Sequence, residues 1–309
     1  MDAFYSHGKF LITGEYLVLK GALSLAQPLR FGQRLDVKNT SAPILHWKSF
    51  DADGHVWADM IFSLPDLKIL AYSKAINQLS NKKIAETLQQ ILIEAKLLNA
   101  GFLQNDSGFL VETHLSFSRD WGLGSSSTLI NNIARWAEVD AFTLSNRTLG
   151  GSGYDIACAN SDQALTYQLK NGLPIVKKVH FDPGFKESLF FVYLNKKQNS
   201  REGIEKFRAG KFDDGTLVAE ITAITEQILK TDSLTDFENL LKDHEKIIAG
   251  ILSSEPVQKK RFPDYFGQTK SLGAWGGDFI LATGNEETPS YFEKKGYPTI
   301  FPYSDMVLK

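Results

Sequence analysis

The pattern of apolar and polar positions along the chain predicts both strands and amphipathic helices. The clearest helix is marked by apolar residues that recur every three or four positions on one face: Ile84, Leu88, Ile91, Leu92, Ala95 and Leu98. Gly101 then ends this helix. Residues 217–229 and 237–251 repeat at the same spacing, whereas residues 108–117 alternate and residues 188–194 are continuously apolar, as strands are. The chain is therefore expected to combine sheet and helix along its length.

Turn residues divide the remaining apolar runs into short elements. A Thr-Gly-Glu turn separates strand segments at residues 10–12 and 16–19, and the Asn171-Gly172 pair predicts a hairpin. Further predictions are a strand at 31–37, a hairpin turn at 51–54, a helix at 67–79, a turn into a helix at 149–159 and a strand at 279–282. Helices dominate from Arg201 onward, and the Asp-Pro-Gly turn at 182–184 is the best candidate for a domain boundary.

Composition narrows the class of protein. The 309 residues are 43% apolar and 23% charged, the balance of an ordinary globular protein. The formal net charge of −2 and the lack of a lysine or arginine block argue against a nucleic-acid surface. The single cysteine, Cys158, excludes an internal disulfide. Without a leader-like start or a membrane-length apolar run, we expect a cytoplasmic protein with no nucleic-acid or membrane partner. A homodimer is one option for its assembly.

Residues 121–128, Trp-Gly-Leu-Gly-Ser-Ser-Ser-Thr, form a glycine- and serine-rich turn between a strand and a helix. Gly122 and Gly124 let the backbone approach a bulky anion, and the helix start aims free N–H groups at the same point. The three serines add hydroxyl groups, including a candidate Mg²⁺ ligand. This pattern favours a phosphate-binding loop. The alternative is that the serines only cap the helix.

Three glycine-rich turns look like parts of one site because each has a charged residue at its edge. Lys9 precedes the first turn and Glu15 lies within it, Asp155 lies in the second, and Asp278 ends the third. Phosphoryl transfer needs backbone donors for the phosphates, a cation near the transferred group and a base for the acceptor hydroxyl. Each residue also has a purely structural explanation: a solvated lysine, a helix cap at Asp155, and two ordinary turn residues.

The order of these motifs resembles the GHMP kinases, small-molecule kinases that include galactokinase, homoserine kinase, mevalonate kinase and phosphomevalonate kinase. The motifs are Ser-His-Gly-Lys-Phe-Leu-Ile-Thr-Gly-Glu-Tyr at 6–16, Gly-Leu-Gly-Ser-Ser-Ser at 122–127 and Lys-Ser-Leu-Gly-Ala-Trp-Gly-Gly-Asp at 270–278. They occur in the family's order and span nearly the whole chain. Residues 151–157 resemble the segment that carries the family's catalytic aspartate, and their Gly-Tyr-Asp-Ile-Ala core is similar to the signature of the GYDIA subfamily.

The resemblance implies a two-domain α+β fold. A domain over residues 1–183 would be similar to ribosomal protein S5 domain 2, and a ferredoxin-like domain would cover residues 184–309, with ATP and the acceptor between them. The implied activity is ATP- and Mg²⁺-dependent transfer of the γ-phosphoryl group to mevalonate or phosphomevalonate. Tyr16 and the closing Gly-Gly-Asp look more like phosphomevalonate kinases, because mevalonate kinases usually have His where Tyr16 stands.

The resemblance also assigns roles by matching position. Asp155 would be the base that takes the acceptor's proton, and Lys9 would stabilise charge on the transferred phosphoryl group. Ser126 would bind Mg²⁺. The loop expected to wrap the ATP phosphates comprises Gly122, Leu123, Gly124, Ser125, Ser126 and Ser127. The acceptor side would be lined by Glu15, Tyr16, Gly276 and Gly277.

Alternative functions remain open, and the sequence departs from the family's pattern at several positions. Homoserine, a sugar or another small alcohol is an alternative acceptor, and a non-catalytic nucleotide-binding protein of this fold is an alternative function. Asp120 adds negative charge near the expected phosphates, and Trp121 and Trp275 stand where most relatives have small residues. The family's second acidic Mg²⁺ ligand has no counterpart in the matching stretch 144–148. Metal binding would then rest on Ser126 and the nucleotide.

Overall fold

The computed structural model describes residues 1–73, 78–104, 107–198, 200–210 and 213–308. Contacts divide the chain into two compact units that interleave along the sequence. The first unit comprises Met1–Gly8, Phe31–Arg119 and Gly124–Asn160, and the second comprises Lys9–Arg30, Asp120–Leu123 and Ser161–Lys309. These units are defined by contacts and not by one cut in the chain. The domain boundary expected after residue 183 therefore stays a prediction.

The first unit is built from a mixed sheet and helices. Its own elements are β3 (Ile44–Phe50), β4 (Val56–Ser63), β5 (Ile69–Tyr72), α1 (Gln78–Leu98), β6 (Gly108–Leu115), α2 (Ser125–Trp136), α3 (Ala141–Thr148) and α4 (Tyr154–Ala159). Two long strands, β1 (Asp2–Leu11) and β2 (Ser24–Thr40), pair with each other and run through both units. The order is β5-β4-β3-β6-β2, antiparallel except for the parallel pair β3 and β6.

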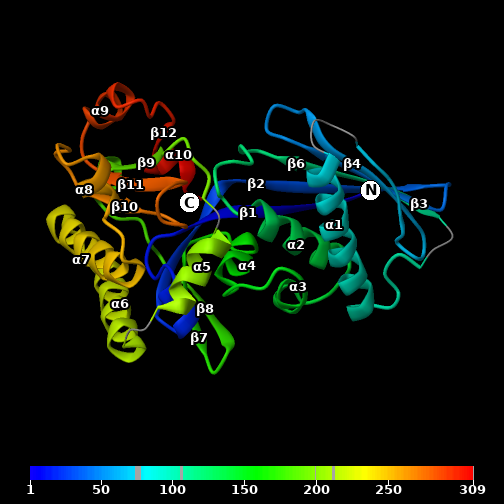
Figure 1. The fold of residues 1–309 in the computed structure, drawn as a ribbon, viewed down its shortest axis with the longest axis horizontal. Coiled ribbons are helices and arrows are strands. Elements are labelled where there is room, and N and C mark those ends of the chain that lie inside the picture. Colours follow the sequence, from blue (N-terminus) through cyan, green and yellow to red (C-terminus); the bar gives the residue numbers. More distant parts are fainter. Residues whose placement is uncertain (74–77, 105–106, 199, 211–212, 309) are drawn as a thin grey trace. The chain divides into compact units, whose positions relative to one another are not determined.

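One face of this sheet is buried under α1 and α2 (Figure 1). In β6, buried positions alternate with half-buried ones, as in a strand with one face against a core. Trp47, Phe62 and Val111 come from three strands and share one apolar cluster with Leu88 and Leu92 of α1. Residues of α2, α3 and α4 belong to the same cluster. The apolar stripe of α1 is therefore the face that packs on the sheet.

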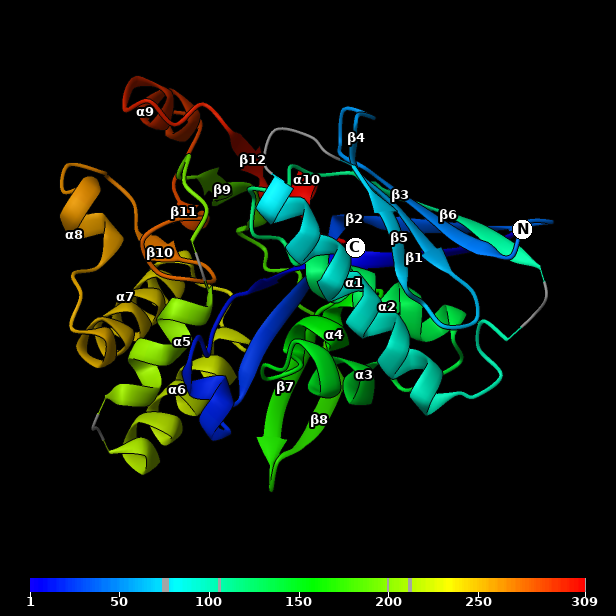
Figure 2. The same cartoon turned by 45° about the vertical axis from the view of Figure 1, so that its right-hand side comes forward.

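The second unit contains a hairpin, a four-stranded sheet and helices. The hairpin is β7 (Leu165–Lys170) with β8 (Leu173–Lys178), and β7 pairs with residues 24–26 of β2. The sheet is antiparallel in the order β10-β11-β9-β12, from β9 (Leu189–Tyr193), β10 (Thr269–Ser271), β11 (Phe279–Thr283) and β12 (Ile300–Pro302). The helical elements are η1 (Leu17–Lys20), η2 (Lys186–Ser188), α5 (Ser200–Ala209), α6 (Asp214–Ile228), α7 (Leu234–Leu252), α8 (Val257–Arg261), α9 (Thr288–Lys294) and α10 (Tyr303–Met306). Helices α6 and α7 lie side by side (Figure 2).

Most of the elements expected from the sequence are present. The strands predicted at 108–117 and 188–194 are β6 and β9, and the two helices predicted after residue 201 are α6 and α7. The Asn171-Gly172 pair closes the β7–β8 hairpin with both residues at positive φ, 53° and 77°. The mixture of helix and strand confirms the α+β class.

Two predictions were wrong. Residues 16–19 were expected to form a strand, but Tyr16 has a φ of 64° and Leu17–Lys20 form the short 3₁₀ helix η1. Leu17 and Val18 are buried, so the apolar run indicates burial. It is too short to distinguish the spacing of a strand from that of a helix. The helix expected at 67–79 is also absent where it can be checked. Leu67 lies in a turn at φ 56°, and Ile69–Tyr72 form β5, paired with β4. Residues 74–77 lie outside the described chain.

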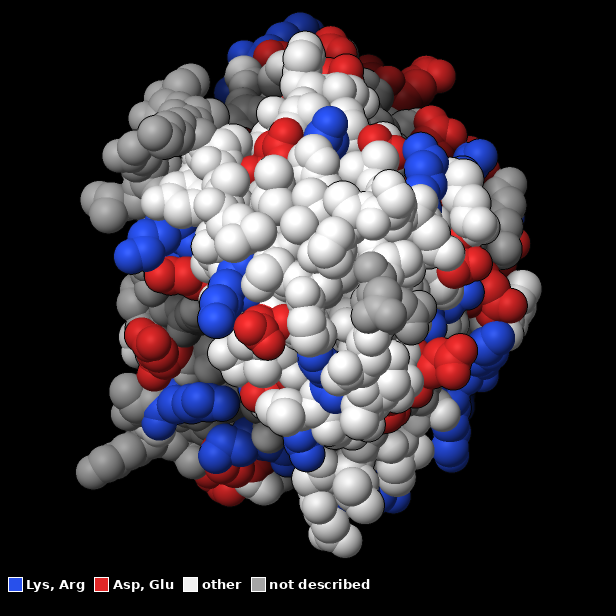
Figure 3. All heavy atoms as spheres, turned by 90° about the vertical axis from the view of Figure 1, so that its right-hand side faces the viewer, with Lys and Arg blue, Asp and Glu red and all other residues white. Residues whose placement is uncertain are grey.

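Among the described residues, none of the helices combines the length and the apolar character that crossing a membrane requires. On the face shown in Figure 3, the described lysine and arginine side chains are intermixed with aspartate and glutamate side chains. They surround a largely uncharged centre. The charges on this face do not gather into a broad region of one sign among the residues described there.

Candidate functional site

Lys9 and the first glycine of the expected phosphate loop meet in the second unit. Lys9 lies on β1, and its Nζ donates a hydrogen bond to the backbone oxygen of Gly122 over 3.0 Å. The backbone N–H of Lys9 donates to the oxygen of Leu123, also over 3.0 Å. The fold thus joins the first and second motifs, although 113 positions separate Lys9 from Gly122. An ammonium group at this position is of the kind that binds phosphate through charge-assisted hydrogen bonds.

Asp278 brings the third motif to the same glycine. Its carboxylate is buried and accepts a hydrogen bond from the backbone N–H of Gln198 over 3.0 Å. A Cβ atom added to Gly122 would lie only 2.6 Å from Cγ of Asp278. Burial raises the pKa of Asp278, while the hydrogen bond from Gln198 and the charge of Lys9 oppose that rise. Within the second unit, all three motifs therefore converge at Gly122.

Replacing Gly122 with Ala is expected to lower both stability and nucleotide affinity. Gly122 has a φ of 69°, a conformation that costs an L residue roughly 1–2 kcal/mol. The new methyl group would also overlap the carboxyl of Asp278. We expect Gly122→Ala to lower the free energy of unfolding by more than the strain alone and to weaken ATP binding by about tenfold, which is ~1.4 kcal/mol. Urea denaturation and calorimetric titration with ATP measure the two effects.

Gly150→Ala is the matched control for that prediction. Gly150 has almost the same φ, 68°, but a Cβ atom there would meet nothing within 4 Å. Its loss of stability therefore reports the strain alone. Equal losses of stability in the two variants, or unchanged ATP affinity in Gly122→Ala, would contradict the packing of Asp278 against the loop.

The phosphate loop continues into the first unit, where it begins α2. Gly124 occupies the cap position with a φ of 95°, and within the described residues no side-chain hydrogen bond caps this helix. The Ser127 hydroxyl is buried and donates to the oxygen of Gly124 over 2.8 Å, whereas Ser126 is exposed. The serines are therefore not caps, which was the alternative explanation of this sequence. The first turn of α2 presents N–H groups and partial positive charge, the arrangement that binds phosphate.

Buried polar side chains hold α2 against the first two strands. The Ser6 hydroxyl donates to Oδ1 of Asn132 over 2.7 Å and accepts from Nδ2 of Asn131 over 2.9 Å. Nδ2 of Asn132 donates to the oxygen of Gln33 over 2.9 Å, and the Thr128 hydroxyl donates to Oε1 of Gln33 over 2.8 Å. These bonds satisfy polar groups that would otherwise be costly to bury. They fix the first turn of α2, and sequence analysis did not anticipate them.

Asp155 lies in the first turn of α4, a six-residue helix of the first unit. Gly153 is the cap of this helix with a φ of 89°, so Asp155 is not a helix cap. Oδ1 of Asp155 accepts a hydrogen bond from the backbone N–H of Ile156 over 3.0 Å, and the residue is half-buried. Helix α4 packs on α2, which starts with the phosphate loop. The carboxylate is therefore oriented by the backbone. Its role as the catalytic base stays a prediction.

The residues expected on the acceptor side belong to the second unit. Glu15 is 2% exposed and Tyr16 is 8% exposed. The Tyr16 hydroxyl accepts from the backbone N–H of Trp275 over 3.4 Å, which joins the first and third motifs. Gly276 is exposed, whereas Gly277 is buried and a Cβ atom there would lie 2.4 Å from a backbone oxygen. Contact of these residues with an acceptor stays a prediction.

Trp121 and Asp120, which precede the loop, differ in their environments. The ring of Trp121 meets the rings of Phe279 and Phe301 edge-on, with centroids 5.8 and 5.3 Å apart. Trp121 is thus part of an aromatic cluster of the second unit. Asp120 is exposed, so water and salt screen its charge. Residues 144–148 lie in α3 and include no carboxylate. Ser126 therefore stays the predicted metal ligand.

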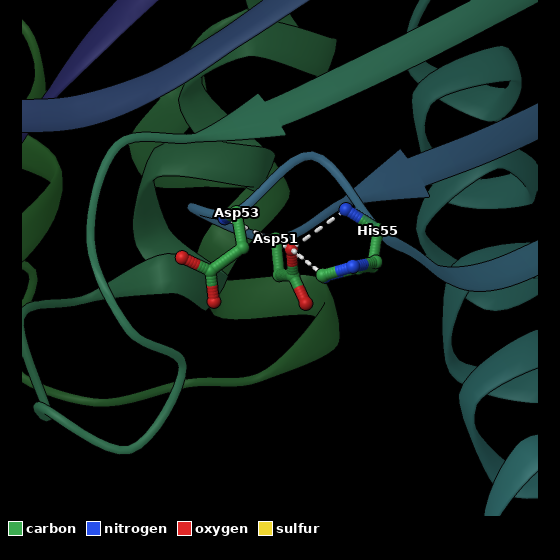
Figure 4. Close-up of side chains that lie close together, drawn as sticks. All are labelled: Asp51, Asp53 and His55. Atoms are coloured by element: carbon green, nitrogen blue, oxygen red, sulfur yellow. Dashed lines mark hydrogen bonds and ion pairs between the residues drawn. The ribbon is translucent and has the colours of Figure 1, made fainter.

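A cluster of possible metal ligands occurs elsewhere, in the turn between β3 and β4. Ligand atoms of Asp51, Asp53 and His55 lie within 4.8 Å of one another (Figure 4). Oδ1 of Asp51 accepts from the backbone N–H groups of Asp53 over 3.0 Å and His55 over 2.9 Å. These bonds close the turn, as Asp commonly does in this position. They explain the cluster without a metal ion.

The second unit contains a group of buried ionisable residues that was not predicted from the sequence. His244 and Glu245 on α7 and Lys270 on β10 are 0%, 2% and 0% exposed. His244 and Lys270 contact Glu15, which was expected on the acceptor side. A signal was present, because positions 244 and 245 lie on the stripe of α7 that is buried through Phe237, Leu241 and Ile248. Buried polar residues on an apolar stripe must be paired.

The comparisons with known proteins concern the fold. The chain matches no protein-family model, and no curated protein matches it. It is similar in structure to the mevalonate kinase of Methanococcus jannaschii, with a TM-score of 0.70 and 15% identity over 100% of this chain and 98% of that one. Streptococcus pneumoniae phosphomevalonate kinase in complex with phosphomevalonate and AMPPNP has a TM-score of 0.67 and 15% identity, covering 100% and 98%. Lactococcus lactis galactokinase complexed with galactose has a TM-score of 0.65 and 14% identity, over 97% of this chain and 92% of that one.

These three solved proteins are GHMP kinases, and each matches this chain over nearly its full length. The resemblance predicted from the three motifs is thus confirmed for the fold. Sequence identities of 14–15% leave the acceptor undetermined, since the three neighbours act on different molecules. The chain has the two-domain α+β fold of the GHMP kinases.

Proposed function

We propose that this protein is an ATP- and Mg²⁺-dependent kinase that transfers the γ-phosphoryl group to mevalonate or phosphomevalonate in the cytoplasm. The observation that carries the proposal is the start of α2. A glycine at positive φ caps this helix, the following hydroxyl of Ser126 is exposed, and the cap position leaves the first-turn N–H groups to an anion. A structural turn would not need this combination.

The chain's own groups account for the steps of phosphoryl transfer. The first turn of α2 would bind the β- and γ-phosphates through backbone N–H groups. Lys9, which donates to Gly122 O, would stabilise the charge on the transferred group. Asp155 would accept the proton of the acceptor hydroxyl as oxygen attacks the γ-phosphorus and the bond to the β-phosphate oxygen breaks. ADP and the phosphorylated acceptor leave.

The donor set near the loop fits a magnesium ion that is bound chiefly by the nucleotide. Mg²⁺ prefers oxygen ligands and commonly keeps several waters while bridging substrate phosphates. The exposed Ser126 hydroxyl offers one such oxygen. When bound, the ion would neutralise phosphate charge.

The acceptor is best tested by a panel. Purified protein with Mg·ATP would be incubated separately with mevalonate, phosphomevalonate, homoserine and galactose, and ADP release would be followed. ADP formation only with mevalonate or its phosphate supports the proposal and chooses between the two. Turnover with galactose or homoserine alone would keep the kinase and replace the acceptor.

Ser126→Ala separates catalysis from mere nucleotide binding in the same assay. Removing the exposed hydroxyl is expected to raise the Mg²⁺ concentration needed for half-maximal rate. Ser116→Ala removes a hydroxyl that hydrogen-bonds to the backbone of Gly32, and it is expected to leave that requirement unchanged. ATP binding without ADP release for any acceptor would instead favour a non-catalytic nucleotide-binding protein.

A further inference from the structure

Four ionisable side chains are buried together in the second unit. Glu15 follows the first-motif turn, His244 and Glu245 lie on α7, and Lys270 lies on β10. Each is at most 2% exposed. Burying charge is costly unless the charges are paired and hydrogen-bonded. The contacts among these groups therefore indicate which of them are charged in the folded protein.

Lys270 and His244 contact opposite oxygens of the Glu15 carboxyl. The Nζ of Lys270 forms an ion pair with Oε1 of Glu15 and donates to the oxygen of Ser271 over 2.9 Å. Nε2 of His244 lies 3.2 Å from Oε2 of Glu15. The same Nε2 accepts a hydrogen bond from the backbone N–H of Gly14 over 2.9 Å. Because Nε2 is an acceptor there, the imidazole is neutral with its hydrogen on Nδ1.

Glu245 contacts Ser271, the residue that follows Lys270 on β10. Its Oε1 accepts from the backbone N–H of Ser271 over 3.1 Å, and its Oε2 lies 3.4 Å from the Ser271 hydroxyl. The cluster thus contains two carboxyl groups, one ammonium group and one neutral imidazole. Electrical neutrality inside it requires one proton on the carboxyl pair. Oε2 of Glu15 lies 3.2 Å from Nε2 of His244 and has no hydrogen-bond partner among the described residues, so it is free to carry that proton.

These contacts lead directly to the phosphate loop. The first-motif turn is tied to α7 through Gly14 and to β10 through Glu15. Strand β10 runs into the loop that ends at Asp278, whose carboxylate packs against Gly122. Lys9 then donates to the oxygen of Gly122. A shift of β10 would therefore move the groups that surround the first glycine of the loop.

We propose that Lys270, His244 and Glu245 are positioning residues that hold Glu15 and the glycine-rich turns of the second unit in one arrangement, and that this arrangement includes one proton shared by Glu15 and Glu245. The consequence for catalysis rests on the proposed kinase function, whereas the network does not. Glu15 then acts through the turns it holds. This explains why the fold buries a charged residue of the first motif.

The shared proton has a defined effect of pH on stability. Burial raises the pKa of Glu245 to about 8, with the negative charge of Glu15 adding to the rise and Lys270 opposing it. Burial also raises the pKa of Glu15, against the charges of Lys270 and Lys9. The folded state therefore holds a proton that the unfolded chain has released above pH ~4.5, so stability falls as pH rises toward 8. Burial and Lys270 lower the pKa of His244, whose opposite effect is complete above pH ~6.5.

Urea denaturation between pH 7 and pH 8.5 tests the network without reference to activity. One proton bound only by the folded state raises the unfolding equilibrium constant by up to about tenfold per pH unit. We expect this rise in the wild-type protein and its loss in Glu245→Gln, which keeps the shape and hydrogen bonds of Glu245 but cannot ionise. Asp243→Asn, a change at an exposed carboxyl on the same helix, is expected to keep the wild-type dependence.

Hydrogen exchange in the folded protein tests the positioning itself. Peptides covering residues 12–17 and 271–278 are expected to exchange faster at pH 8.5 than at pH 7, relative to β3 peptides in the same sample, and Glu245→Gln is expected to remove this difference. A purely structural role would not make the protection of these turns depend on pH. If Glu245→Gln does not fold, Glu15→Gln carries the same test, since it removes the other carboxyl.

A wild-type protein whose stability does not fall over this range, or a Glu245→Gln variant with an unchanged dependence, would overturn the network. That result is separate from the acceptor panel. The pH dependence with no ADP release from any acceptor would leave the network standing and reject the kinase. ADP release without this pH dependence would support the kinase and reject the network.

Discussion

Asp155→Asn is expected to lower kcat by about 10²–10⁴-fold, the usual contribution of a positioned general base. The amide keeps the size of the side chain and its hydrogen bond from the N–H of Ile156, which spans 3.0 Å. It cannot accept the acceptor's proton. The fold should survive, because Asp155 is half-buried and is not the cap of α4. Steady-state kinetics with the acceptor identified in the panel measures the loss, and circular dichroism checks the fold.

Asp162→Asn is the matched control for this substitution. Asp162 is an exposed carboxylate that pairs with Lys178 over 2.6 Å on the β7–β8 hairpin. It lies only seven positions along the chain from Asp155. Its replacement is expected to leave kcat unchanged. Comparable turnover in Asp155→Asn and Asp162→Asn would remove Asp155 from the mechanism.

Lys9→Met is expected to lower kcat by about 10²–10³-fold, the range for losing one group that stabilises charge in a transition state. Lys9 is the ammonium held at the start of the phosphate loop by its 3.0 Å hydrogen bond to the oxygen of Gly122. Methionine keeps the length of the apolar stem and removes the charge. Because the backbone bond from Lys9 to Leu123 is kept, the strand should stay in place. Single-turnover kinetics with saturating ATP separates the chemical step from binding.

Lys9→Arg and Lys20→Met are the control variants for Lys9→Met. Arginine restores the positive charge, so partial rescue of kcat is expected, limited by its larger fork-shaped head. Lys20 is a half-exposed lysine that pairs with Asp214 over 2.7 Å, and its loss should not change kcat. A Lys9→Met enzyme with full activity would show that charge at this position is not needed for transfer.

Periodicity located most of the elements but misjudged two short ones. Helix α1 and strand β6 repeat long enough for the spacing to identify them. The apolar run at 16–19 is four residues long, and its burial in η1 comes from packing that no local pattern reports. At 67–79 the pairing of β5 with the preceding strand β4 prevailed over the local apolar spacing.

The motifs located the candidate residues, but their surroundings could not be predicted from the sequence. Gly122 and Asp278 belong to glycine-rich turns, and Lys9 precedes one on β1. Such turns can be recognised from the local sequence. That they meet depends on contacts across more than a hundred positions. The same holds for Glu15, which the motif places on the acceptor side and the fold buries between Lys270 and His244.

The amino-acid sequence by itself determined the three motifs, their order, their glycine-rich turns and the resemblance to GHMP kinases, because each depends on residue identity over short stretches. Only the tertiary structure decided that Gly122 is packed against Asp278, that Gly124 and not a serine caps α2, and that Glu15 is buried between Lys270 and His244. Burial and long-range pairing set these features, since both are properties of the folded chain.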